Sequence, residues 1–149
     1  MDEGQVKRVH SLAQLDRDAV SVYDEALKHV DDDDTKAHFV EFRDEHAHHV
    51  TKLSEAIVRL GGPEPELKVD LMGIVADWVT AFRSILGEKG PLHAMHSAES
   101  YHNSRYKEAA SWDIGDSDLS SELQTFYSEE QRHMSYVEDK LAAKTSPAV

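Results

Sequence analysis

The sequence contains no cysteine, and glycine and proline are scarce, at 7 and 4 of 149 residues. A chain without cysteine can form no disulfide, zinc ribbon, iron–sulfur cluster or thiol nucleophile. The few glycines and prolines cluster at a few places, which argues against a many-turned β protein and favours a few long helices. The length suits one domain, residues 1–149, that buries a core of its own.

The chain also has little positive charge and no long apolar run. Asp and Glu number 29 against 16 Lys and Arg, so the net charge is −13, which disfavours nucleic acid and anionic membrane surfaces as partners. No apolar run approaches the roughly 20 residues that span a bilayer. The segment MDEGQVKRVH lacks the apolar core of a signal peptide, so a cytoplasmic location is expected. Histidine, by contrast, is abundant, at 10 residues.

Turn signals divide the chain into segments with a helical period. The signals are Asp31–Asp34, Leu60-Gly61-Gly62-Pro63, Gly87–Pro91 and Asp113–Asp118. They predict long helices over about 5–30, 34–60, 91–112 and 117–143, and a short apolar-striped helix over about 70–86. The short helix lies in the long connection between two hairpins. The expected fold is all-α: an antiparallel four-helix bundle of two helical hairpins joined by a long crossover.

Seven ionisable residues interrupt the apolar stripes of the four long helices. They are Asp16, His46, His49, Glu99, His102, Glu130 and His133. Each is flanked by apolar residues at spacings of three or four, the pattern of a buried seam. Each lies 13–18 residues from the turn of its hairpin, which is about 20–27 Å along a helix. The seven groups therefore face one another within each hairpin, and a twofold axis between the hairpins would bring them into one layer.

The two hairpins repeat these interrupted positions at offsets of 83 and 84 residues. The matching motifs are Asp16-x-x-Ala19-x-x-x-Tyr23 with Glu99-x-x-His102-x-x-x-Tyr106, and Phe42-x-x-x-His46-x-x-His49 with Phe126-x-x-x-Glu130-x-x-His133. Tyr23 and Tyr106 are candidates for hydrogen bonds to the carboxylates, or are core tyrosines.

Three carboxylates and four imidazoles would be costly to bury without partners. Either they bind cations, or they form a hydrogen-bond network that satisfies itself. A mixture of carboxylate and imidazole suits iron, manganese or zinc. Three carboxylates would offset most of the charge of two divalent ions.

At these positions the chain resembles the ferritin-like superfamily, and rubrerythrins most closely. Those proteins carry a Glu on the first and third helices and Glu-x-x-His on the second and fourth, around two irons. Their first-helix pattern Glu-x-x-Ala-x-x-x-Tyr is similar to Asp16, Ala19 and Tyr23. The chain also resembles an uncharacterised bacterial branch of ferritin-like proteins whose second helix carries Asp/Glu-His-x-x-His, here Glu45-His46-Ala47-His48-His49.

The chain departs from that pattern in its ligands. Asp16 is one methylene shorter than Glu, and His46 stands where the family has a bridging Glu. A literal Glu-x-x-His exists as Glu45 and His48, about 100° off the stripe, and it ranks second as a ligand pair. His96, one turn before Glu99, is a further outer candidate. One metal, two inequivalent metals or none remain open.

Two classes of function follow. In the first, the resemblance implies iron chemistry with oxygen or peroxide, as in a ferroxidase, peroxidase or oxidase. The electron donor would then be another protein or a small molecule, because the Cys-rich electron-transfer domain of full rubrerythrins is lacking. In the second, the bundle is a non-catalytic stress or assembly protein with a structural or vestigial metal site. A second copy of the chain, in a homodimer, is a further partner hypothesis.

Overall fold

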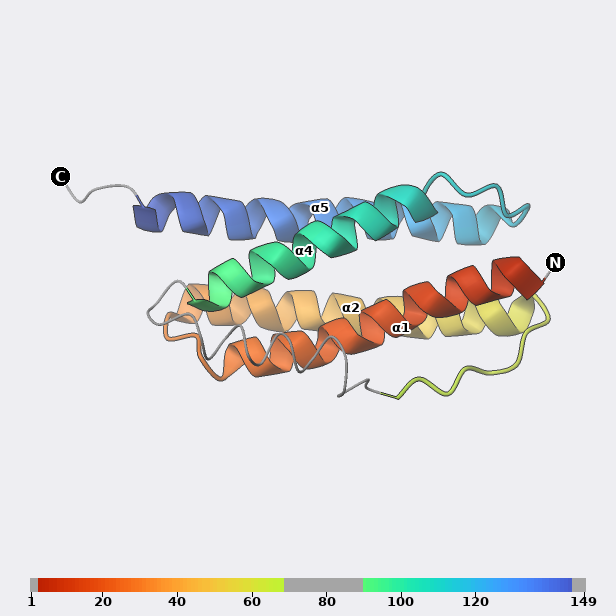
Figure 1. Ribbon diagram of the computed structural model, residues 1–149, viewed down its shortest axis with the longest axis horizontal. Coiled ribbons are helices and arrows are strands. Elements are labelled where there is room, and N and C mark those ends of the chain that lie inside the picture. Colours follow the sequence, from red (N-terminus) through yellow and green to blue (C-terminus); the bar gives the residue numbers. More distant parts are fainter. Residues whose placement is uncertain (1–2, 69–89, 146–149) are drawn as a thin grey trace.

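The computed structural model describes residues 3–68 and 90–145, and within these ranges the regular structure is entirely α-helical (Figure 1). The helices are α1 Glu3–Leu27, α2 Asp33–Arg59, α4 Gly90–Ala109 and α5 Ser117–Thr145. None of these helices is long and apolar enough to cross a membrane. The predicted all-α bundle of four long helices is therefore confirmed. The short helix predicted over about 70–86 lies outside the described residues.

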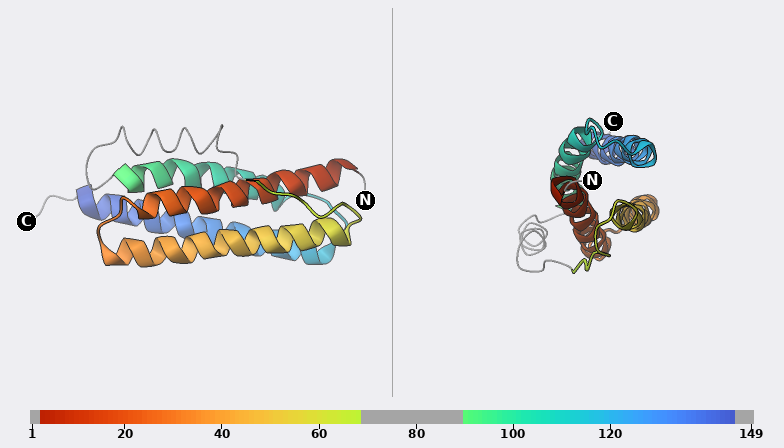
Figure 2. Two further views of the ribbon diagram at one scale, coloured as in Figure 1. Left: turned by 90° about the horizontal axis from the view of Figure 1, so that it is seen from below. Right: turned by 90° about the vertical axis from the view of Figure 1, so that its right-hand side faces the viewer.

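Two antiparallel hairpins, α1 with α2 and α4 with α5, form the bundle (Figure 1). The hairpins meet through contacts of α1 with α4 and of α2 with α5. In the end-on view of Figure 2, α1 lies beside α4. Every helix thus borders one helix of its own hairpin and one of the other, so each can direct side chains to a common centre.

Local hydrogen bonds set where α2 begins and where it ends. The Asp32 carboxylate accepts from the backbone N–H of Thr35 at 2.9 Å, so Asp32 is the N-cap of α2. Gly61 adopts a φ of 92°, a conformation that L side chains rarely adopt, and the Gly62 N–H then bonds the Ile57 carbonyl at 2.9 Å. This turn closes α2 at the position that its Gly-Gly pair predicts.

Two predicted helix ends are wrong by about three residues. The first helix ends at Leu27 rather than near residue 30, and the third ends at Ala109 rather than near 112. After each end, N–H groups bond carbonyls three residues back, as His29 does with Ala26 and Trp112 with Ala109. This tighter winding continues the helical period for a few residues after the α-helix has ended.

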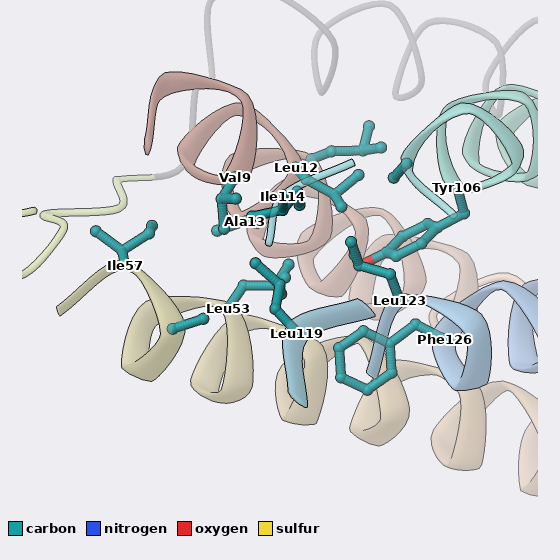
Figure 3. Packing of buried hydrophobic residues seen from close by; sticks show 13 residues of the cluster. Val9, Leu12, Ala13, Leu53, Ile57, Tyr106, Ile114, Leu119, Leu123 and Phe126 are labelled. Atoms are coloured by element: carbon teal, nitrogen blue, oxygen red, sulfur yellow. The ribbon is translucent and has the colours of Figure 1, made fainter. Parts of the chain in front are cut away.

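Two apolar clusters lie on either side of the centre of the bundle. The first includes Val9, Leu12, Leu53, Leu119, Leu123 and Phe126, which converge from three helices in Figure 3. The second includes Val22, Tyr23, Phe39, Phe42, Met95 and Val137. On every helix the residues between these two clusters include the ionisable positions of the seam. The apolar clusters therefore hold the helices together above and below a polar layer.

Leu53 offers a test of this packing. Leu53 is fully buried in the first cluster, whereas Val58 on the same helix is 51% exposed. Leu53→Ala should lower the free energy of unfolding by about 2–5 kcal/mol, because it removes apolar contacts and leaves a cavity. Val58→Ala should change it by no more than about 0.5 kcal/mol. Urea unfolding of both variants measures the difference, and equal effects would contradict this assignment of the core.

Candidate metal centre

The structure brings all seven stripe-interrupting residues into one buried layer between the two apolar clusters. α1 supplies Asp16, α2 supplies His46 and His49, α4 supplies Glu99 and His102, and α5 supplies Glu130 and His133. Their exposed fractions are between 0 and 5%. The layer forms because each helix presents its ionisable positions on the same stripe as its apolar ones. That these residues ligate metal stays a prediction.

One half of the layer, called here the Asp16 half, collects groups from α1, α2 and α5. Asp16 Oδ1 lies 2.7 Å from His46 Nδ1 and 3.1 Å from His49 Nδ1. Glu130 Oε1 lies 3.4 Å from the same His46 nitrogen and 3.7 Å from the same His49 nitrogen. Two imidazole nitrogens and two carboxylate oxygens thus enclose one small space.

The other half, called the Glu99 half, collects groups from all helices except α1. Glu99 Oε1 lies 3.5 Å from His46 Nε2, 3.6 Å from His133 Nδ1 and 3.7 Å from His102 Nδ1. Glu130 Oε2 lies 3.7 Å from His133 Nδ1 and 3.9 Å from His102 Nδ1. His46 and Glu130 therefore belong to both halves.

The geometry within each half suits a metal ion. In each half, four residues offer ligand atoms that all lie within 4.8 Å of one another. The two sets are Asp16, His46, His49 and Glu130, and His46, Glu99, Glu130 and His133. Nitrogen and carboxylate donors in such numbers are typical of iron, manganese and zinc sites.

Several buried polar atoms in the layer have no hydrogen-bond partner among the described residues. They are Glu99 Oε2, His102 Nδ1, both carboxylate oxygens of Glu130, and His133 Nδ1. Native structures rarely leave such groups unpaired, since each costs the free energy of removing it from water. Four of these five atoms belong to the Glu99 half, and the fifth, Glu130 Oε1, lies beside His46 and His49 in the Asp16 half. A cation in the layer would satisfy these atoms, so the donor set fits bound metal.

Two glutamates outside the layer orient its histidines. His49 donates from Nε2 to Glu129 at 2.5 Å, and His133 donates from Nε2 to Glu45 at 2.5 Å. Each contact crosses from one hairpin to the other. A carboxylate on the outer nitrogen fixes the ring and keeps a proton there, which leaves Nδ1 facing the layer, an arrangement common among metal-binding histidines.

Two tyrosines hold the carboxylates of the layer in the same crosswise manner. Tyr23, in the first hairpin, donates to Glu99, and Tyr106, in the second, donates to Asp16. Burial, together with Glu99, raises the pKa of Tyr23 well above its usual value, and burial with Asp16 does the same for Tyr106. Both phenols therefore remain protonated donors at neutral pH.

These contacts repeat with the offsets of the sequence. The Tyr106–Asp16 and Tyr23–Glu99 bonds correspond, as do the His49–Glu129 and His133–Glu45 bonds. Glu129 was not among the residues predicted from the sequence. The offset of 84 residues relates it to Glu45, so the repeat contained the signal that would have found it.

The second-rank candidates lie outside the layer. Glu45 contacts the outer nitrogen of His133 and also accepts from Arg132. His48 is exposed, with its ring edge-on to Phe126. His96 is half-buried and lies 3.6 Å from Glu138. Glu45 and His48 lie about 100° off the apolar stripe, which explains why they do not enter the layer.

Opposite charges inside the layer shift its pKa values strongly. Burial alone would raise the pKa of Asp16, but His49 and His46 lower it well below the usual range. Burial would lower the pKa of His46, but Glu130, Asp16 and Glu99 raise it to about 10.

Burial raises the pKa of Glu130 well above its usual value, and the charges of Glu99 and Asp16 add to that effect. In His133, burial lowers the pKa, but Glu45 and Glu99 outweigh this and raise it to about 9. Nearby carboxylates likewise outweigh burial and raise the pKa of His49. With pKa values of about 10 and about 9, His46 and His133 hold protons at neutral pH when no metal is bound.

Comparison with known proteins places the chain in a family. The sequence profile of a family described as a domain of unknown function (DUF2383) matches residues 5–112. The match includes the layer residues of α1, α2 and α4 and ends before α5. Comparison with the curated proteins and with the solved structures gives no match.

The pH dependence of the metal-free protein tests these charges. Between pH 6.5 and about 9, folded His46 and His133 keep protons that unfolded histidines have released. Their stabilisation is full below pH 6.5 and is lost as pH rises through the folded pKa values. The free energy of unfolding in chelator should therefore fall from pH 7 to 9, by roughly 1 kcal/mol per pH unit for each histidine.

His46→Asn should reduce this slope to about half, since His133 still titrates, and His96→Asn, outside the layer, should leave it unchanged. Urea unfolding at several pH values measures the slope. A wild-type stability that stays constant or rises over this range would contradict the assigned protonation.

Proposed function

We propose that this chain, which belongs to the DUF2383 family, binds two transition-metal ions in the polar layer of its bundle, with iron as the metal that it uses. The observation that carries the proposal is that buried polar atoms of Glu130, Glu99, His102 and His133 have no hydrogen bond within the described part of the chain. They are buried in the layer, and α4 and α5 supply them. Bound cations would supply the interaction that these atoms lack.

The charges in the layer favour two divalent ions over one. Asp16, Glu99 and Glu130 supply three carboxylates, and the donors divide into two sets that each suit one ion. Glu45 and Glu129, at the outer nitrogens of the histidines, add negative charge nearby. This much negative charge in a buried site is stable only with cations or with several bound protons.

The surrounding residues would position and shield the metal ligands. The Phe42 ring stacks on His133 with centroids 4.1 Å apart, and Phe126 stacks on His49 at 4.0 Å. These rings fix the imidazole planes and exclude water from two sides. Tyr23 and Tyr106 hold the carboxylates of the opposite hairpin. Bound iron would supply electron transfer to oxygen or peroxide, as in the rubrerythrin-like proteins that the chain resembles.

A structural role is the second candidate, and one observation favours it. Asp16 is fully satisfied by protein groups: His46 and His49 bond one oxygen, and Tyr106 bonds the other. A buried polar network of this kind can fix the register of helices without any ligand. The bundle would then serve stress response or assembly, with a vestigial site.

Metal affinity separates the two candidates. Glu130→Ala combined with His133→Ala should abolish tight binding of Fe(II) or Mn(II) in anaerobic calorimetry, because it removes donors from both halves. His96→Ala with Glu138→Ala is the matched control, since this pair has the same residue types on the surface. The control should bind metal as the wild type does. The wild-type melting temperature should fall on chelation by mass action.

Suppose instead that chelation leaves the melting temperature unchanged and the layer variant melts higher than the wild type. The polar layer would then be no working metal site, and the structural role would explain it.

Oxygen consumption tests the redox part. Aerobic addition of Fe(II) to the wild type and to the surface control should consume oxygen in proportion to the protein concentration, measured with an oxygen electrode. The layer variant should consume oxygen only at the rate of free Fe(II). Equal rates for all three proteins would show that the layer does not carry out this reaction.

A further inference from the structure

His46 directs its two ring nitrogens into different halves of the layer. Its Nδ1 lies 2.7 Å from Asp16 Oδ1, in the Asp16 half, and its Nε2 lies 3.5 Å from Glu99 Oε1, in the Glu99 half. His49 and His133, in contrast, direct Nε2 outward to a glutamate and only Nδ1 toward the layer. Among the described residues, His46 thus differs from both in facing the layer with both nitrogens.

Glu130 divides its oxygens in the same way. Its Oε1 lies 3.4 Å from His46 Nδ1 in the Asp16 half, and its Oε2 lies 3.7 Å from His133 Nδ1 in the Glu99 half. The offset of 84 residues relates Glu130 to His46. The two side chains that belong to both halves are therefore counterparts in the two hairpins, one a carboxylate and the other an imidazole.

Neighbouring rings enclose the His46 imidazole and hold it in this orientation. The centroids of Tyr23, His102 and His133 lie 5.5, 5.1 and 5.2 Å from that of His46, and the side chain is 1% exposed. A ring flip would put Cδ2 in place of Nδ1 and Cε1 in place of Nε2, so only the observed orientation keeps a nitrogen toward each of Asp16 and Glu99.

We infer that His46 is a bridging ligand, which binds one metal ion through Nδ1 and the other through Nε2. The inference rests on the proposed two-metal function and specifies how the two ions are joined. On loading, two metal–nitrogen bonds form, and the ring releases its N–H protons to solvent, so that it binds as imidazolate.

The charge balance supports an imidazolate. Asp16, Glu99 and Glu130 carry three negative charges when deprotonated, one short of two divalent cations. An imidazolate at His46 adds the fourth, so the seven side chains of the layer balance the two ions, while Glu45 and Glu129 lie outside the layer at the outer histidine nitrogens. A buried site without net charge has a smaller desolvation cost than one with an excess charge.

A histidine bridge would also set the spacing of the ions. Two metal–nitrogen bonds of about 2 Å and the width of the ring separate the ions by about 6 Å. Two-metal sites usually have ions about 3.5–4 Å apart. The two ions would then be bound as neighbours with different ligand sets, since only the Glu99 half has the additional His102 nitrogen.

Crystals of the full chain loaded with Co(II) test the inference through anomalous difference maps. The wild type should show two peaks about 6 Å apart, each beside one nitrogen of His46. In His46→Glu the peaks should approach to about 4 Å, because a carboxylate bridge is shorter. In solution, His46→Gln should weaken the second Co(II) binding step at least tenfold in calorimetry, and His96→Gln should leave it unchanged.

Two wild-type peaks within about 4 Å of each other, or a His46 that contacts a single ion, would overturn the bridge and leave the metal site intact. Unchanged binding in His46→Gln would overturn the bridge as well, whereas a single bound ion would overturn both the bridge and the two-metal function. Absence of any bound ion in crystals and in calorimetry would instead defeat the proposed function. The wild-type map decides the question even if His46→Glu does not fold.

Discussion

Burial of seven ionisable side chains in one layer is the constraint on which the rest of this structure depends. Removing three carboxylates and four imidazoles from water is costly unless each finds a partner. The bundle supplies partners from every helix, and it does so crosswise: Tyr23 reaches Glu99 and Tyr106 reaches Asp16. Because these bonds join the two hairpins, they also determine how the hairpins are aligned. The apolar clusters on either side stabilise the bundle, while the layer fixes its register.

Protons and metal ions are alternative ways to balance the charge of this layer. Without metal, protons on His46 and His133 offset the charges of Asp16 and Glu99. These protons do not give every buried group a hydrogen bond, since both oxygens of Glu130 and the inner nitrogen of His133 have none among the described residues. Metal ions would replace the protons and satisfy these atoms at the same time. Metal binding to this layer is therefore coupled to proton release.

The sequence was sufficient to predict the four long helices and the seven residues of the buried layer. Apolar residues at helical spacing located the four long helices. Interruptions of these stripes located the buried ionisable residues, because all residues of a stripe lie on the same face of their helix. The helix ends near Leu27 and Ala109 were missed because a few residues of tighter winding continue the same period.

The outer contacts of the layer were harder to predict. Glu45 lies about 100° off the stripe, which excluded it from the centre but did not show that it reaches His133 across the gap between α2 and α5. Glu129 is one of 29 acidic residues, and only its relation to Glu45 through the repeat distinguishes it. Which nitrogen of each histidine faces inward depends on these contacts, and therefore on the packing of one hairpin against the other.

The metal content of the protein, purified without added metal, tests the central claim most directly. Elemental analysis should find first-row transition metal, mainly iron, approaching two ions per chain, and removing it should lower the melting temperature reversibly. A metal-free protein whose melting temperature does not respond to added Fe(II), Mn(II) or Zn(II) would contradict the claim.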